Sequence, residues 1–285
     1  MESRHAVLTR ADGAQASQLP PITLDGWYVL HQLFRIEWPR LKSLDPEDVT
    51  RLRASLDGLG QRWGTLEAGW SGFYSMVGSG VDLMLLHFRD TLDGLSATRV
   101  EISSSAFGDL LVLDREYVSI VELGLYALTS DLAASVDPGD PELWARAVEN
   151  RLSEERARTF VQRRLYPTQP DDMPYVCYYP MDKRRKPGVN WYTLGLDERA
   201  RLMMAHGAVG RRYARRISQI ISGSIGLADW EWAVTLFAGD PVDFKRVVTE
   251  MRYDEVSALY ADFGQFFVGK KTTPGELGGL LAGAV

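Results

Sequence analysis

The chain has 285 residues, 45% of them hydrophobic and 11% aromatic, which is enough to bury a substantial core in one or two domains. Its net charge of -6 argues against nucleic acid as a partner, and no apolar run approaches the roughly 20 residues of a membrane span. The single cysteine, Cys177, excludes an intramolecular disulfide and favours a reducing compartment; we interpret it as a small buried residue rather than a reactive thiol.

The first half of the chain has the pattern of two helices set among four strands. Residues 1–20 lack the apolar core of a signal peptide, and we interpret them as a disordered lead-in to a cytoplasmic protein. In residues 21–126, Asp45 precedes Pro46 and two acids, which is typical of a helix start, and a second helix is expected to break near Gly94. Segments rich in β-branched and aromatic residues predict strands over 26–36, 70–78, 81–88 and 117–123.

The second half repeats this order after an interruption. Residues 127–163 hold charged helical segments around a Pro-Gly turn and predict an inserted, surface-exposed helical connector. In residues 164–270, one helix is expected to be capped by Asp197 and to reach about Arg216. Residues 271–285 are rich in Gly and Ala and predict a flexible tail. The second set of strands is expected over 175–179, 217–222, 230–237 and 266–268, and its second helix over 241–251.

The repeated order predicts an α+β protein built from two ferredoxin-like βαββαβ units. Met76–Phe88 and Ile220–Phe237 share a Gly-Ser turn, an aspartate and an apolar strand, which indicates a duplication. Each four-stranded sheet would carry helices on one face and must pack its other face. We therefore expect the two sheets to close on each other as a dimeric α+β barrel within one chain, with a cavity between them.

His206 is the first candidate for chemistry. It lies among apolar residues of a predicted helix, and Gly207 and Gly210 leave bare backbone beside it, where a flat ligand can approach. From the pattern alone, a buried core histidine stays open as an alternative to a metal ligand. No second His or Cys stands nearby as a zinc site requires, whereas a single axial histidine suits haem.

Tyr179 ends a strand shortly before a cationic run from Lys183 to Lys186. Tyr178 and Tyr179 must point to opposite faces of the sheet, so one of them faces the expected cavity. Arg and Lys at a strand end suit carboxylates. An ordinary barrel tyrosine and a solvated loop remain the alternatives for these two features.

Polar and aromatic residues on the neighbouring strands fit the same kind of ligand. Gln219 alternates with isoleucines on one strand face, where it needs a hydrogen-bond partner or water. Trp230 and Trp232 share one face of the next strand, and Trp191 follows the cationic run. Aromatic walls suit a macrocycle, although tryptophans at this spacing are more commonly core. Together these residues indicate an anion-binding cavity with one histidine placed for haem.

The stretch Arg164–Gly269 resembles the coproheme decarboxylases, which belong to the chlorite dismutase-like haem proteins. The resemblance is carried by long motifs in matching order, and YVSIVEL at 117–123 extends it into the first half. The motifs are YPMDKRR at 179–185, NWY at 190–192, RLMMAHGAVGRRYA at 201–214, QIISGSIGLADWEWAVTLF at 219–237 and EMRYDEVSALYADFG at 250–264.

The resemblance implies a cytoplasmic homopentamer that converts iron coproporphyrin III to haem b. Two propionates lose carbon dioxide and become vinyl groups, with hydrogen peroxide as the oxidant, and the iron porphyrin is both substrate and redox centre. It also implies transient contact with the coproporphyrin ferrochelatase, and neither nucleic acid nor a membrane span.

The resemblance also assigns roles to residues. His206 matches the axial iron ligand, and Tyr179 matches the tyrosine that becomes a radical and takes a hydrogen from the propionate β-carbon. Lys183 matches the lysine that holds or protonates the reacting propionate. Gln219 matches the distal position that contacts peroxide. The remaining positions implied to contact the porphyrin are Arg164, Tyr117, Met181, Trp191 and Ser257.

Gln219 separates two related functions. Chlorite dismutases carry an arginine at that distal position, so glutamine together with Tyr179 and Lys183 favours decarboxylation. A chlorite-degrading haem enzyme and a non-catalytic haem carrier or sensor are the alternatives. Residues 127–163 and the chain beyond Lys270 fall outside the resemblance and receive no role.

Overall fold

In residues 18–283, which the computed structural model describes, nine strands form one sheet that closes on itself. β5 (Tyr175–Lys183) pairs with both β11 (Phe267–Thr272) and β9 (Trp232–Ala238), which joins the two ends of the strand order. The predicted barrel is confirmed. Of the lead-in expected over 1–20, residues 1–17 lie outside the described part of the chain.

The first half is a ferredoxin-like unit with its strands in the order β4-β1-β3-β2. Asp45 caps α2 as predicted, since its side chain accepts a 2.8 Å hydrogen bond from the Asp48 amide. The break expected near Gly94 is absent from α3, because Thr91 caps that helix by accepting from the Gly94 amide. The elements are β1 (Thr23–Ile36), α2 (Pro46–Gly64), β2 (Trp70–Val77), β3 (Leu83–Arg89), α3 (Leu92–Ser103) and β4 (Leu111–Gly124).

The second half has the equivalent order β11-β5-β9-β8, and the pairs β2–β11 and β4–β8 join the halves. The helix expected from Asp197 to Arg216 instead begins after Gly195 and ends at Arg211, because residues 212–216 turn the chain into β8. Asp197 lies in the first turn of that helix, where an acid suits the helix dipole. The further elements are α7 (Leu196–Arg211), β8 (Ile217–Gly223), α8 (Val242–Met251), α9 (Glu255–Tyr260) and β10 (Ala261–Phe263).

The space between the two sheets is a packed core, and this corrects the expectation of a cavity there. Alternate side chains of the strands fill the barrel, among them Leu33, Tyr178 and Phe237. The ring of His31 stacks on that of Tyr178 with centroids 4.2 Å apart, and His31 is fully buried, as expected for a core histidine. Any ligand site must therefore lie on the outer faces of the barrel.

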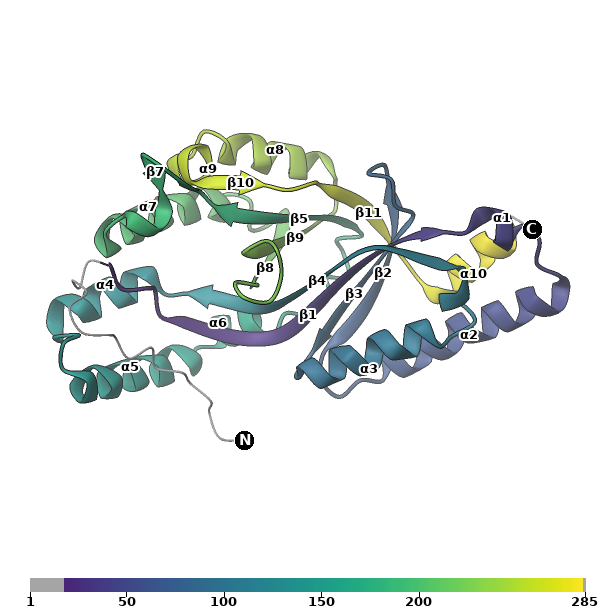
Figure 1. The fold of residues 1–285 in the computed structure, drawn as a ribbon, viewed down its shortest axis with the longest axis horizontal. Helices are drawn as coiled ribbons and strands as arrows, with labels where there is room; N and C mark the ends of the chain where they lie inside the picture. Colours follow the sequence, from purple (N-terminus) through teal and green to yellow (C-terminus); the bar gives the residue numbers. More distant parts are fainter. Residues whose placement is uncertain (1–17, 284–285) are drawn as a thin grey trace.

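Helices cover the two outer faces at opposite ends of the molecule (Figure 1). In the first half, α2 and α3 are joined by α10 (Pro274–Ala282), whose Leu277 and Leu281 are buried against the same core. The prediction of a flexible tail over 271–285 is thus wrong for its described part. In the second half, α7 and α8 cover the sheet.

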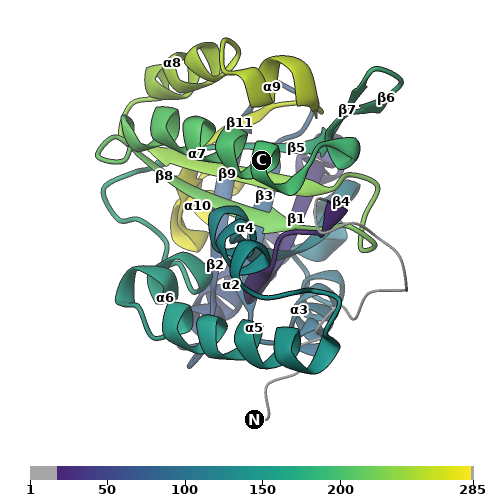
Figure 2. The same ribbon diagram turned by 90° about the vertical axis from the view of Figure 1, so that its left-hand side faces the viewer.

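The segment between the halves forms three helices with a core of their own. Trp144, Val148 and Leu152 are buried there against Leu24 and Leu165. α5 (Pro141–Arg156) and α6 (Thr159–Leu165) lie at the end of the molecule opposite α8 and α9, and α4 (Tyr126–Ser135) packs against α7 (Figure 2). None of the helices described in 18–283 is long and apolar enough to cross a membrane.

Candidate functional site

A cavity of about 730 Å³ lies between the outer face of the second sheet and the helices α7 and α8. This volume is within the range of roughly 300–1,000 Å³ common for small-molecule sites. Its floor consists of outward-facing residues of β5, β8 and β9, and residues of α4, α5 and α6 line one side.

The sheet register fixes the order of the side chains on the floor. Tyr179 is paired with Val234, and Val234 with Ile221 of β8. Two residues further along β5, Met181 pairs with Trp232. Tyr179, Met181 and Lys183 therefore share one face of β5 and all line the cavity, because alternate residues of a strand point the same way.

His206 reaches the cavity from α7, and its orientation is held by Asp254. The imidazole Nδ1 lies 2.6 Å from Oδ2 of Asp254, a carboxylate that is nearly buried. Although burial raises the pKa of Asp254, the hydrogen bond to His206 lowers it, and the net pKa is below the ordinary value. A carboxylate on Nδ1 selects the tautomer that leaves Nε2 free as a ligand, as in many metal sites.

The backbone beside His206 is open to the cavity. Gly207 and Gly210 both line it. An added Cβ at Gly207 would meet only the end of the Arg211 side chain, and one at Gly210 only the terminal methyl of Met251. In residues 18–283 no three His, Cys, Asp or Glu side chains gather to hold a metal ion. The donor set here is one imidazole beside an apolar space, which suits an iron porphyrin.

Tyr179 is buried among aromatic rings. It is 8% exposed, and its ring stacks on Phe266 with centroids 4.2 Å apart. Burial raises the pKa of its hydroxyl above the ordinary value, so Tyr179 is a neutral phenol at pH 7. Within the described residues this hydroxyl has no hydrogen-bond partner, although it belongs to a side chain that lines the cavity.

Lys183 is a nearly buried cation at the end of β5. It is 7% exposed, and its Nζ lies 4.3 Å from the ring centroid of Trp191. Burial lowers the pKa of its ammonium group to about 8, although Asp254 and Glu231 favour the charged form. Trp191 itself is 1% exposed and does not line the cavity, so it contacts Lys183 from behind rather than facing the ligand space.

Most of the other residues predicted from the resemblance line this cavity, and one does not. Gln219, Met181, Ser257 and Arg164 are among its lining residues. Tyr117 faces the barrel interior instead, where its hydroxyl donates to the Trp230 carbonyl at 2.8 Å. The expectation that Tyr117 contacts the porphyrin is therefore wrong in this structure, because position 117 is on the inner face of β4.

The structure adds lining residues that sequence reasoning missed. Tyr126, at the start of α4, lines the cavity and packs edge-on against Trp191. Glu122 also lines it and accepts from the Trp232 indole, and burial raises its pKa. Glu122 and Tyr117 are an odd number of residues apart on β4, so their side chains point to opposite faces of the sheet. This spacing could have been read from the sequence. Five arginines bring cations to the same cavity: Arg151, Arg158, Arg164, Arg211 and Arg252.

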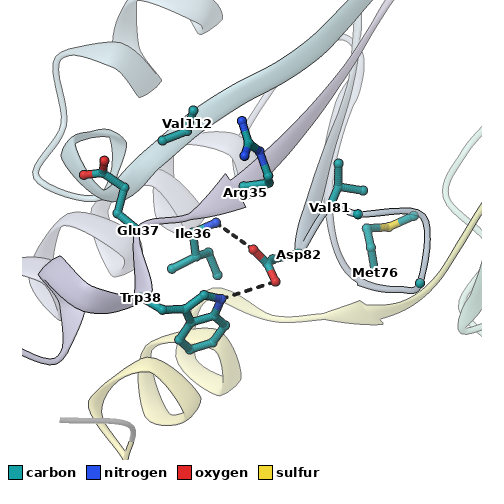
Figure 3. Close-up of a pocket in the computed structure, with 10 residues that line it drawn as sticks. Arg35, Ile36, Glu37, Trp38, Met76, Val81, Asp82 and Val112 are labelled. Atoms are coloured by element: carbon teal, nitrogen blue, oxygen red, sulfur yellow. Dashed lines mark hydrogen bonds between the residues drawn. The ribbon is translucent and has the colours of Figure 1, made fainter.

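A second hollow, of about 610 Å³, lies in the first half between the end of β1 and the turn from β2 to β3. Asp82 is its main polar group, and Figure 3 shows that both carboxylate oxygens already accept hydrogen bonds, from the Ile36 amide at 2.8 Å and the Trp38 indole at 3.3 Å. None of the predicted site residues lines it. The cavity beside His206 is therefore the candidate site.

The fold and the site define a single-chain dimeric α+β barrel with one histidine over an apolar, cation-bordered cavity. Residues 49–272 match the sequence profile of the family described as chlorite dismutase, and the chain belongs to this family.

Three relatives narrow the comparison. A coproheme decarboxylase from Staphylococcus saprophyticus is 41% identical over 266 residues, which cover 92% of this chain and 98% of the relative. A heme-binding protein from Thermus thermophilus has a solved structure with a TM-score of 0.80 and 40% identity, covering 93% of this chain and 99% of that one. A protein from Natronomonas pharaonis, named as a candidate for heme binding, is 39% identical over 92% of this chain, but the chain spans only 42% of its length.

Proposed function

We propose that the protein removes two propionate carboxyl groups from iron coproporphyrin III, giving haem b, with hydrogen peroxide as the oxidant. One observation carries the proposal: the Tyr179 and Lys183 side chains line the same cavity as His206, and neither the hydroxyl nor the ammonium has a hydrogen-bond partner within the described residues. Because buried polar groups are normally hydrogen-bonded, an unpaired hydroxyl and an unpaired ammonium at a cavity are suited to bind polar groups of a ligand. The 41% identity to a coproheme decarboxylase supports the same reading.

The residues of the cavity fit an iron porphyrin. His206 would hold the iron through Nε2, since Nδ1 is engaged by Asp254. The apolar floor of Met181, Val234 and Leu236 suits the macrocycle, and the arginines of the border suit its carboxylates. When bound, the iron supplies the centre that peroxide oxidises.

Each decarboxylation balances as a two-electron oxidation. The propionate β-carbon loses a hydrogen atom, the carbon–carbon bond to the carboxylate breaks, and carbon dioxide leaves with a vinyl group remaining. One hydrogen peroxide takes up the two electrons and one further proton and becomes two waters. Tyr179, as a phenoxyl radical, takes the hydrogen atom, and a neutral phenol held in a dry aromatic setting is suited to exchange a proton and an electron together.

Lys183 would hold the carboxylate of the reacting propionate. A nearly buried ammonium without an ion pair in the described residues gains a partner when a carboxylate enters, and such charge-assisted hydrogen bonds are short and strong. Tyr179 and Lys183 are four residues apart on one strand face, roughly 13 Å along the strand. A substrate whose carboxylate lies at one residue and whose reacting carbon lies toward the other suits this spacing.

A second candidate function follows from the family itself, whose description is chlorite dismutase. Gln219 on the cavity floor argues against it, because the resemblance implies an arginine there in chlorite-degrading members. A non-catalytic haem carrier is the third candidate. The cytoplasmic location, the homopentamer, the contact with a ferrochelatase and the division of the chain at 127–163 stay predictions.

The test compares two reactions and the binding of haem b in one preparation. The protein loaded with iron coproporphyrin III is treated with hydrogen peroxide and the porphyrin is analysed by chromatography; the protein loaded with haem b is treated with chlorite and oxygen is measured. Haem b formation without rapid oxygen evolution supports the proposal. Rapid oxygen evolution would favour the chlorite reading, and tight haem b binding with neither reaction would favour the carrier.

A further inference from the structure

The strand end that carries Lys183 lies beyond the pairing of β5 with β9. The ladder between β5 and β9 ends with the pair Met181–Trp232. Asp182 and Lys183 extend past this point on one side, and Glu231 precedes β9 on the other. A short strand, β10, pairs with the opposite edge, where Ala261 faces Lys183. Backbone amides on the β9 side therefore need other partners.

Two carboxylates replace the missing ladder bonds. The Lys183 amide donates to Oε2 of Glu231 at 2.7 Å, and the Glu231 amide donates to Oδ1 of Asp182 at 2.7 Å. In each of the two segments, a backbone amide thus donates to a side-chain carboxylate of the other segment. Glu231 is only 7% exposed, so its hydrogen bonds are protected from water and are costly to lose.

Glu231 also ties in the loop that surrounds Lys183. Its Oε1 lies 3.4 Å from Arg185 in the hairpin of β6 (Arg185–Lys186) and β7 (Val189–Asn190). That hairpin leads to Trp191, whose ring lies under the Lys183 ammonium. The backbone on the other side is fixed too, because the Ser224 amide donates to the Glu231 carbonyl at 2.8 Å.

The charge of Glu231 acts on the same ammonium group. The charged groups that favour the protonated form of Lys183 are Asp254, ahead of α9, with the larger effect, and then Glu231, on the β8–β9 side. Asp254 already accepts from His206, whereas Glu231 shares its charge with Arg185 at the surface. Glu231 is thus the carboxylate that both holds the Lys183 backbone and favours the charged form of its side chain.

We infer that Glu231, with Asp182, is a positioning residue for Lys183: its carboxylate holds the end of β5 in register and keeps the ammonium charged where the substrate carboxylate binds. The role toward the substrate carboxylate rests on the proposed function, whereas the positioning of Lys183 concerns the protein alone. The inference assigns a catalytic contribution to a side chain that does not line the cavity.

The positioning is tested without any porphyrin. The chain has six lysines, so competitive labelling with acetic anhydride across pH, read by peptide mass analysis, gives the titration of Lys183 separately. Glu231→Gln keeps an oxygen for the Lys183 amide but removes the charge, so the pKa of Lys183 should fall below that of the wild type. A fall of one unit from a pKa of about 8 raises the neutral fraction at pH 7 roughly fivefold. Glu231→Ala should in addition speed hydrogen exchange of the Lys183 amide at least about tenfold.

Glu250→Gln is the matched control, because Glu250 pairs with Arg212 and neither lines the cavity nor acts on Lys183. It should change neither readout. Unchanged labelling in Glu231→Gln together with unchanged exchange in Glu231→Ala would overturn the inference. In the loaded protein, Glu231→Ala should lower the decarboxylation rate while leaving the porphyrin Kd within about twofold. If labelling and exchange change in the two Glu231 variants but the wild type makes no haem b, the proposed function fails and the positioning stands.

Discussion

The imidazole of His206 and the carboxylate of Asp254 lie 2.6 Å apart, although the two residues are 48 positions apart in the chain. Asp254 also caps α9, since its Oδ2 accepts from the Ser257 amide at 3.1 Å. One carboxylate therefore orients the candidate iron ligand and starts the helix that brings Ser257 to the cavity. A substitution that keeps the helix cap but changes the hydrogen bond to His206 can separate these two roles.

Asp254→Asn should weaken the bond between the iron and the protein without unfolding α9. Asparagine caps helices as well as aspartate does, but its neutral amide is a poorer partner for Nδ1–H and makes the imidazole a weaker donor. We expect an affinity for haem lower by about 10-fold or more and a lower iron–histidine stretching frequency by resonance Raman. His206→Ala sets the limit and should abolish that band while the carboxylate contacts retain porphyrin. An iron–histidine band that persists in His206→Ala would exclude His206 as the ligand.

Much of this architecture was predictable from patterns in the sequence. The order of helices and strands in both halves follows from hydrophobic alternation and from signals such as Asp45 ahead of Pro46. The contact of His206 with Asp254 was not predictable, because nothing local in the sequence connects these two positions. The position of the cavity was missed for a physical reason: both faces of β5 are apolar, and the pattern does not tell which face packs tightly.

The C-terminal helix shows where composition misled the prediction. Its many glycines favour a flexible chain, but α10 is stabilised by its packing on α2. A local signal was present: Thr273 and Glu276 form a capping box around Pro274, and the Thr-x-x-Glu spacing is visible in the sequence. Tyr117 was misassigned for a similar reason, since the motif gave its place along β4 without its face.

Leu277→Ala should destabilise the first half of the barrel. Leu277 is 2% exposed in the core that α10 shares with α2, and truncation there leaves a cavity, at a cost of about 2–5 kcal/mol. Leu280→Ala on the same helix is the control, because Leu280 is 60% exposed and should cost less than about 0.5 kcal/mol. Urea unfolding measures both. Equal effects of the two substitutions would contradict the packing of α10.

Tyr179→Phe should bind iron coproporphyrin III with a Kd near that of the wild type but form no haem b with peroxide, because phenylalanine keeps the ring and loses the hydroxyl. Tyr178→Phe makes the same change one residue away on the inner face of the barrel, against His31, and should leave turnover intact. Product analysis by chromatography compares the two. Loss of turnover in both, or in neither, would argue against a specific role for the Tyr179 hydroxyl.

Decarboxylation by the wild type should fall as the pH rises through about 8, since the Lys183 ammonium is lost there. Stability should move in the opposite sense. The folded-state pKa of Lys183 lies below the ordinary 10.5, so between about pH 8 and 10.5 the unfolded chain binds more protons and the contribution of Lys183 to the free energy of unfolding rises. Comparing Lys183→Met with the wild type across pH isolates both effects. A pH profile of activity shared by the two proteins would contradict the assignment.

Arg164→Gln should weaken the binding of iron coproporphyrin III by about 10- to 100-fold, the loss expected for one hydrogen bond to a charged group. Arg164 lines the cavity and has no ion pair within the described residues, so it is available for a carboxylate. Arg146→Gln on α5 makes the same charge change outside the cavity and should leave the Kd unchanged. Fluorescence titration measures both. Similar losses would point to general electrostatic attraction instead of a contact.

The most direct measurement of the central claim is a titration of the protein loaded with iron coproporphyrin III by hydrogen peroxide, with mass analysis of the porphyrin after each addition. We expect two successive losses of a carboxyl group, ending in haem b, with one peroxide consumed for each loss. Bleaching of the porphyrin without those losses would contradict the account and leave His206 as a haem ligand of a protein with another task.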